Sequence, residues 1–109
     1  MRVGFIGLGN VGSKLAGSLL RNDIPLIVRD LDQALAEPFL DGGAQWANSP
    51  AEMAEAADVI ITCLPSPKAC AEVMEAENGV IAGLKPGKIW IEMSTTDFQE
   101  VQRLGHKVA

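Results

Sequence analysis

The stretch VGFIGLGNVGSKLAGSLL, residues 3–20, joins an apolar run to an amphipathic one through a loop that contains three glycines. The apolar run, residues 3–6, is typical of a strand buried on both faces, whereas residues 10–21 have helical periodicity. The glycines at the junction are Gly7, Gly9 and Gly12. Glycine costs conformational entropy, so either the backbone here needs an unusual geometry or something approaches it closely.

A second strand follows the predicted helix. The apolar stripe of that helix is Val11, Leu15, Ala16, Leu19 and Leu20. Residues 25–30, PLIVRD, are again rich in β-forming residues, and strand, turn, helix and strand within this span make a βαβ unit. Such crossovers place the two strands parallel.

The rest of the chain repeats this alternation. Further strands are expected at 44–47, 59–64 and 88–93. Residues 31–41 favour a short or kinked helix because Pro38 lies within them, with Gly42 and Gly43 ending it. Ser49, Pro50 and Glu52 form a good helix start. Other helices are expected at 66–74, 78–84 and 96–109. The fold class is therefore α/β, a three-layer parallel sheet.

GLGNVG, residues 7–12, has the spacing G-x-G-x-x-G in a specific context: it follows a buried strand, opens a helix and precedes an acidic strand end. In such a loop the glycines permit a tight turn, close approach of a pyrophosphate, and close packing of helix on strand. Free N–H groups and the helix dipole stabilise phosphates. We therefore predict a Rossmann-type dinucleotide site. Its loop residues are Gly7, Leu8, Gly9, Asn10, Val11 and Gly12.

Asp30 lies at the carboxyl end of the second strand, where a carboxylate accepts hydrogen bonds from both adenosine-ribose hydroxyls and repels a 2′-phosphate. This favours NAD as the cofactor. Arg29 keeps NADP open as the alternative, although strand alternation points the two side chains to opposite faces and Leu31 offers no donor. A solvated strand-end charge is the other interpretation of Asp30.

Composition excludes several classes of function. A net charge of −5 without a Lys/Arg cluster argues against a nucleic-acid surface. The apolar runs are too short to span a membrane, and no secretory signal is visible, which favours the cytoplasm. Cys63 and Cys70 lack zinc or redox spacing and His106 is the only histidine, so we expect reduced thiols and no metal site.

Three segments in order resemble the β-hydroxyacid dehydrogenase family, of the 3-hydroxyisobutyrate dehydrogenase and tartronate semialdehyde reductase type. They are VGFIGLGNVG, VIITCLPSP and ENGVIAGLKPGKIWIEMST, and the resemblance covers essentially all 109 residues. It implies that Leu64 and Pro65 lie against the cofactor, with Ala69 on the following helix. By the same resemblance Thr95 lies beside the nicotinamide end of the cofactor, and Ser94 is close to the substrate.

The resemblance also implies that residues 1–109 lack the substrate-binding motif and the catalytic lysine of the family. Family members continue into a substrate-binding motif and an all-helical domain with the catalytic lysine, so we expect that lysine to lie beyond Ala109. Residues 1–109 are therefore expected to be a partial N-terminal Rossmann domain, its sheet truncated, with no catalytic residue and no activity alone. The full enzyme would transfer hydride between the cofactor and a small 3-hydroxy carboxylic acid or its semialdehyde.

Two other functions remain alternatives. One is a non-catalytic nucleotide-binding or interaction module, and the other is a relative that reduces imines. Both would share the glycine loop and Asp30 with a hydroxyacid dehydrogenase and differ from it beyond Ala109. An uncovered sheet edge also favours a homo-oligomer.

Overall fold

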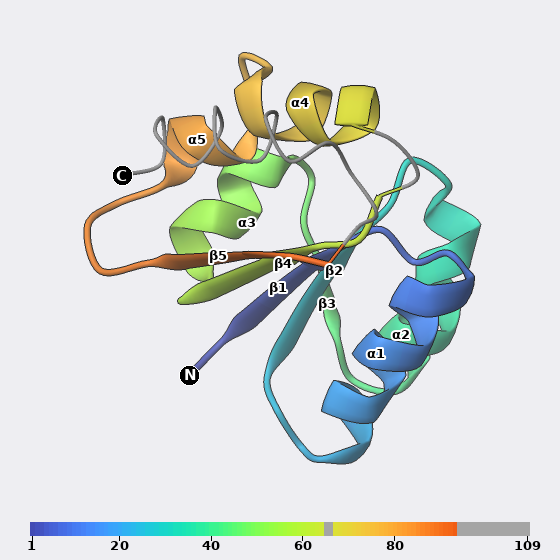
Figure 1. The fold of residues 1–109 in the computed structure, drawn as a ribbon. Coiled ribbons are helices and arrows are strands. Elements are labelled where there is room, and N and C mark those ends of the chain that lie inside the picture. The colour runs from blue at the N-terminus through green and yellow to red at the C-terminus, as the bar shows by residue number, and fades with distance from the viewer. Residues whose placement is uncertain (65–66, 94–109) are drawn as a thin grey trace.

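The computed structural model describes residues 1–64 and 67–93, which form a parallel sheet with helices on both faces (Figure 1). The strands are β1 Val3–Ile6, β2 Leu26–Arg29, β3 Gln45–Trp46, β4 Val59–Thr62 and β5 Ile89–Glu92. They lie in the order β3-β2-β1-β4-β5, and every neighbouring pair is parallel. The predicted fold class, an α/β Rossmann-type sheet, is confirmed.

Helices cover the sheet in two groups. On one face lie α1 (Asn10–Arg21) and α2 (Glu37–Asp41), which follows a 3-10 turn at Gln33–Ala36. On the other face lie α3 (Pro50–Ala56), α4 (Pro67–Glu75) and α5 (Val80–Gly83) (Figure 1). Because side chains alternate along a strand, each face of the sheet has its own core: Phe5 packs under the first group and Ile6 under the second.

The central strand is β1, and all four of its residues are buried. Its last residue, Ile6, lies opposite Arg29 of β2 and Thr62 of β4. The carboxyl ends of three parallel strands therefore meet at the same edge of the sheet, with Gly7 just beyond the middle one. Ligands bind at this edge in open α/β sheets, where the helices depart to opposite faces.

The amphipathic segment after the glycine loop forms α1 with the bounds that its periodicity predicted. Ala16 is fully buried, and Leu15, Leu19 and Leu20 pack against the same core. The prediction that Val11 belongs to the buried stripe is wrong, because its side chain is 62% exposed. It lies in the first turn of α1, within the glycine loop.

Pro38 shortens the predicted helix at residues 31–41. The segment divides into the 3-10 turn and the five-residue α2, with Pro38 in the first turn of α2. Proline is tolerated there because the first helical N–H groups have no partner within the helix. Gly42 caps the helix and Gly43 has a φ of +106°, which confirms the predicted end.

The remaining elements agree with the sequence in position, with small differences at their ends. The hydroxyl of Ser49 accepts a hydrogen bond from the N–H of Glu52 at 3.1 Å, which confirms the predicted start of α3. β4 ends at Thr62, whereas the strand was expected to continue to Leu64, so Cys63 and Leu64 lie beyond the end of the strand. The last expected helix, from residue 96 to Ala109, lies outside the described residues. None of the described helices has the length and apolar character needed to cross a membrane.

Candidate functional site

Steric contacts at the end of β1 explain two of the three loop glycines. Gly7 has a φ of +103°, and a Cβ on it would collide with the carbonyl oxygen of Cys63. A Cβ on Gly12 would in turn collide with the carbonyl oxygen of Gly7 and lie 3.3 Å from the ring of Phe5. The turn and the close packing of α1 on β1 thus leave no room for a side chain at either position.

Gly9 has a different environment. A Cβ there would meet nothing within 4 Å, so this glycine faces open space. It is the N-cap of α1 and provides no side-chain cap. Among the described residues, no acceptor pairs with the backbone N–H groups of Asn10, Val11 and Gly12. Three free donors and the positive end of the helix dipole therefore point at this open space, as an anion site requires.

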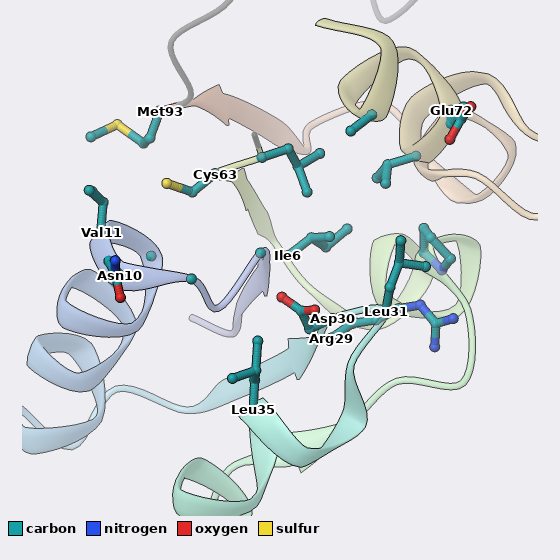
Figure 2. A pocket seen from close by; sticks show the side chains of 17 residues that line it. Ile6, Asn10, Val11, Arg29, Asp30, Leu31, Leu35, Cys63, Glu72 and Met93 are labelled. Atoms are coloured by element: carbon teal, nitrogen blue, oxygen red, sulfur yellow. The ribbon is translucent and has the colours of Figure 1, made fainter. Parts of the chain in front are cut away.

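Asp30 connects the glycine loop to the end of β2. Its Oδ2 accepts a hydrogen bond from the N–H of Leu8 at 2.7 Å, and its Oδ1 accepts one from the N–H of Asp32 at 2.9 Å. A carboxylate oxygen has two lone pairs, so each oxygen keeps one for a further donor. Figure 2 shows the carboxylate of Asp30 pointing away from the guanidinium of Arg29. The two side chains therefore point in opposite directions, as strand alternation predicted.

Arg29 is held on the other side by β3 and the segment after it. Its Nη1 donates a hydrogen bond to the carbonyl oxygen of Ala47 at 2.8 Å. The guanidinium carbon also lies 5.4 Å from the ring centroid of Trp46, within the range of a cation–π interaction. These two contacts direct the positive charge away from Asp30.

A cleft of about 740 Å³ opens at the carboxyl ends of the strands (Figure 2). Eight of the residues predicted from the sequence line it: Gly7, Gly9, Asn10, Val11, Gly12, Asp30, Leu64 and Ala69. Leu8 does not line it, because its side chain is buried in the core and its N–H is bonded to Asp30.

Some of the sequence predictions fall outside the described part of the chain. They concern Pro65, Ser94 and Thr95, which were expected at the cofactor or the substrate. Ala109 lies there too, and the catalytic lysine was expected beyond it. The position of that lysine therefore stays a prediction, as do the roles of the other three residues.

Several further residues line the cleft, although the sequence did not predict them as site residues. They are Ile6, Arg29, Leu31, Leu35, Pro50, Cys63, Glu72, Val73 and Met93. Cys63 and Met93 follow β4 and β5 directly, so the rule that strand ends form the site would have identified them. Most of the others come from loops and helix faces that only the fold brings together.

Cys63 is half-buried in the wall of the cleft, and Cys70 is fully buried on α4. Burial, and secondarily the negative charge of Glu92, raises the pKa of the Cys63 thiol. The thiol of Cys70 donates to Oε2 of Glu92 at 2.7 Å, and the hydroxyl of Thr62 donates to the same oxygen at 2.9 Å. Cys63 and Cys70 are not joined by a disulfide. The described residues hold no group of three or more side chains suited to a metal ion.

Comparison with known families shows to which family the chain belongs. The model of the NAD-binding domain of 6-phosphogluconate dehydrogenase matches residues 2–109. The chain belongs to this family of NAD-binding domains. The resemblance to NAD-binding oxidoreductases found from the sequence is confirmed.

Proteins similar to this chain include oxidoreductases. Mitochondrial 3-hydroxyisobutyrate dehydrogenase of Mus musculus is 42% identical over 94% of this chain, which spans 33% of that protein. The solved structure of Psf3 in complex with NADP+ and 2-OPP is 29% identical with a TM-score of 0.91, over 96% of this chain and 37% of that one. An imine reductase from Pseudomonas sp. is 28% identical with a TM-score of 0.82, over 98% and 36%. The NAD-binding domain thus spans about a third of the length of these relatives.

Proposed function

We propose that residues 1–109 bind NAD, with the pyrophosphate on the first turn of α1 and the adenosine ribose on Asp30. The observation that carries this proposal is that the free N–H groups of Asn10, Val11 and Gly12 and the carboxylate of Asp30 line the same cleft. The N–H groups suit an anion, and the remaining lone pairs of Asp30 suit vicinal hydroxyls. Membership in a family of NAD-binding domains supports the same assignment.

We favour NAD over NADP on the charges around the ribose site. A 2′-phosphate would meet the negative charge of Asp30, and no cation compensates from the next residue, Leu31. The positive charge of Arg29 is already engaged by Ala47 and Trp46. The Psf3 structure contains NADP+, so the preference of this chain needs its own measurement.

Titration calorimetry of the 109-residue chain with NAD and with NADP tests both statements. We expect binding of NAD and weaker binding of NADP. Tighter binding of NADP would overturn the assignment of Asp30 as the discriminating residue. Absence of binding for both dinucleotides would overturn the proposed function itself.

For the complete enzyme we propose hydride transfer between the cofactor and a small 3-hydroxy carboxylic acid or its semialdehyde, with a catalytic lysine beyond Ala109. When bound, the nicotinamide cofactor supplies the hydride or accepts it. The described residues of this chain bind and orient the dinucleotide, and we assign none of them a catalytic role. The isolated chain should therefore bind NAD without oxidising 3-hydroxyisobutyrate, and turnover at an ordinary enzyme rate would contradict this.

Imine reduction is the second candidate, supported by the 28% identity to the Pseudomonas imine reductase. The two reactions share the cofactor site and differ in the substrate. Assays of the complete gene product with 3-hydroxyisobutyrate and with a cyclic imine separate them, and turnover of neither would favour a non-catalytic binding module. Cytoplasmic location stays a prediction.

Homo-oligomerisation also stays a prediction. β5 is at the edge of the described sheet, and its side chains Ile89 and Ile91 are exposed. Such an edge favours association between copies. Sedimentation velocity of the chain at several concentrations tests it, and a monomer at every concentration would contradict it.

A further inference from the structure

The part of the cleft beyond Asp30 has apolar walls. Leu31 follows Asp30 directly and is 96% exposed, although it is a large apolar side chain. Val73 of α4 and Pro50 at the start of α3 line the same cleft. If Asp30 holds the adenosine ribose, as the proposed function requires, the attached base extends past it into this region. A flat base that packs on these side chains would remove their apolar surface from water.

Two charged side chains line this end of the cleft, Arg29 and Glu72. The guanidinium of Arg29 already donates a hydrogen bond to Ala47 and lies over the ring of Trp46. Glu72 is exposed on α4, and within residues 1–64 and 67–93 its carboxylate makes no hydrogen bond or ion pair. Figure 2 shows Glu72 on α4, across the cleft from Leu31 at the end of β2. A free acceptor therefore lies beside the region that the base would occupy.

The chemistry of this acceptor matches one edge of adenine. An ionised carboxylate only accepts hydrogen bonds, and the 6-amino group of adenine donates them. Hypoxanthine has a carbonyl oxygen at the same position, so a carboxylate there would face another acceptor. A site built for a donor rejects an analogue that lacks it, because its polar group is then left without a partner.

We infer that Glu72 is a specificity-determining residue that accepts a hydrogen bond from the 6-amino group of adenine. The site therefore distinguishes NAD from nicotinamide hypoxanthine dinucleotide, which has a carbonyl oxygen in place of the 6-amino group and a proton on the neighbouring N1. Leu31 and Val73 pack on the flat faces of the base, and Glu72 accepts a hydrogen bond from the edge that carries the 6-amino group.

The test compares the dissociation constants of the two dinucleotides by calorimetry. The unaltered chain should bind the hypoxanthine dinucleotide about tenfold more weakly than NAD, the effect of one hydrogen bond to a charged group. Glu72→Gln should bring the ratio close to one, because an amide both donates and accepts. Glu77→Gln is the matched control: Glu77 is exposed in the turn after α4 and outside the cleft, so the ratio should stay unchanged.

The outcomes separate this inference from the proposed function. Equal binding of both dinucleotides by the unaltered chain, or a preference for NAD that survives in Glu72→Gln, overturns the role of Glu72 and leaves NAD binding intact. Failure of the unaltered chain to bind NAD or NADP overturns the proposed function and this inference with it. Circular dichroism of each variant verifies that a changed ratio comes from a folded protein.

Discussion

Asp30 accepts a hydrogen bond from the backbone N–H of Leu8 at 2.7 Å, which joins the glycine loop to the end of the neighbouring strand. The same carboxylate accepts from the N–H of Asp32, so it orders the backbone that follows β1 and the backbone that follows β2. Asp30 therefore has two functions in our proposal. It shapes the loop that receives the pyrophosphate, and it presents its remaining lone pairs to the ribose.

Replacing this carboxylate by an amide separates the two functions. In Asp30→Asn one oxygen becomes an NH₂ group, which would face a backbone N–H, and the negative charge is lost. We expect the affinity for NAD to fall about tenfold, and the free energy of unfolding to fall by about 1 kcal/mol. The ratio of NADP to NAD affinity should rise because the repulsion of the 2′-phosphate disappears. Calorimetry and urea unfolding measure these changes, with Asp41→Asn as an exposed control. An unchanged ratio would contradict the assignment.

Two alanine substitutions in the glycine loop should have opposite consequences. Gly12→Ala places a Cβ against the carbonyl oxygen of Gly7 and should destabilise the fold by about 3 kcal/mol or more. Gly9→Ala places a Cβ in open space at an ordinary φ of −71°, so the fold should lose only about 1 kcal/mol or less, the cost of alanine at an N-cap. Its methyl group would instead lie where the pyrophosphate approaches, and NAD binding should weaken. Unfolding curves and calorimetry distinguish the two variants.

Gly17→Ala is a control for helix propensity. Gly17 lies in α1, and a Cβ there would meet only the flexible end of Arg21, at 3.2 Å. We expect this variant to be more stable by about 0.5–1 kcal/mol and to bind NAD unchanged. Loss of stability in this variant equal to that in Gly12→Ala would show that the steric explanation of Gly12 is wrong.

Ser49 provides a test of the start of α3, where Pro50 lines the cleft. Its hydroxyl accepts from the N–H of Glu52 at 3.1 Å, and Ser49→Ala removes that acceptor. The free energy of unfolding should fall by about 1 kcal/mol in urea titrations. Ser18→Ala, on the exposed side of α1, should change it much less. Equal effects of the two substitutions would rule out a capping contribution.

The reactivity of Cys63 depends on pH in a defined direction. Its pKa is raised above its ordinary value of 9.0 by burial and then by Glu92, so in the folded chain the thiol keeps its proton to higher pH. The stability that this contributes is present below the ordinary pKa and is lost as the pH rises through the raised value. Alkylation by iodoacetamide should therefore be slower than that of a free cysteine at mildly alkaline pH.

Mass spectrometry of the alkylated chain measures this rate, and Cys63→Ser identifies the site. Cys70, 1% exposed, should stay unmodified in the folded state. Because Cys63 lines the cleft, saturating NAD should slow its alkylation further. A rate equal to that of a free cysteine, unaffected by NAD, would contradict the placement of this thiol.

Local patterns in the sequence predicted the elements of the fold well. Periodicity and glycine placement predicted α1, and the serine before Pro50 predicted the start of α3. The placement of Gly7, Gly9, Gly12 and Asp30 at one cleft was also predictable, because these residues lie at a fixed spacing within one βαβ unit; their roles in binding a cofactor stay predictions. Pro65, Ser94 and Thr95 stay predictions, since they lie outside the described residues.

The far end of the cleft was not predictable from such patterns. Leu31, Pro50 and Val73 come from three separate segments, and none of them follows a spacing rule. The contact of Arg29 with Trp46 exists only because β3 lies beside β2. These relationships depend on strand order, which is a property of the whole chain, whereas propensity and capping act over a few residues.

The central position of β1 has a consequence for the order of folding. Val3 pairs with Leu26 of β2 across a short crossover and with Val59 of β4 across half of the chain. The first pairing closes a small loop and the second a much larger one, whose entropy cost is greater, so the β1–α1–β2 unit can form before β4 docks. The cleft is complete only after that docking. A dinucleotide that needs both walls should then slow unfolding and leave the refolding rate almost unchanged.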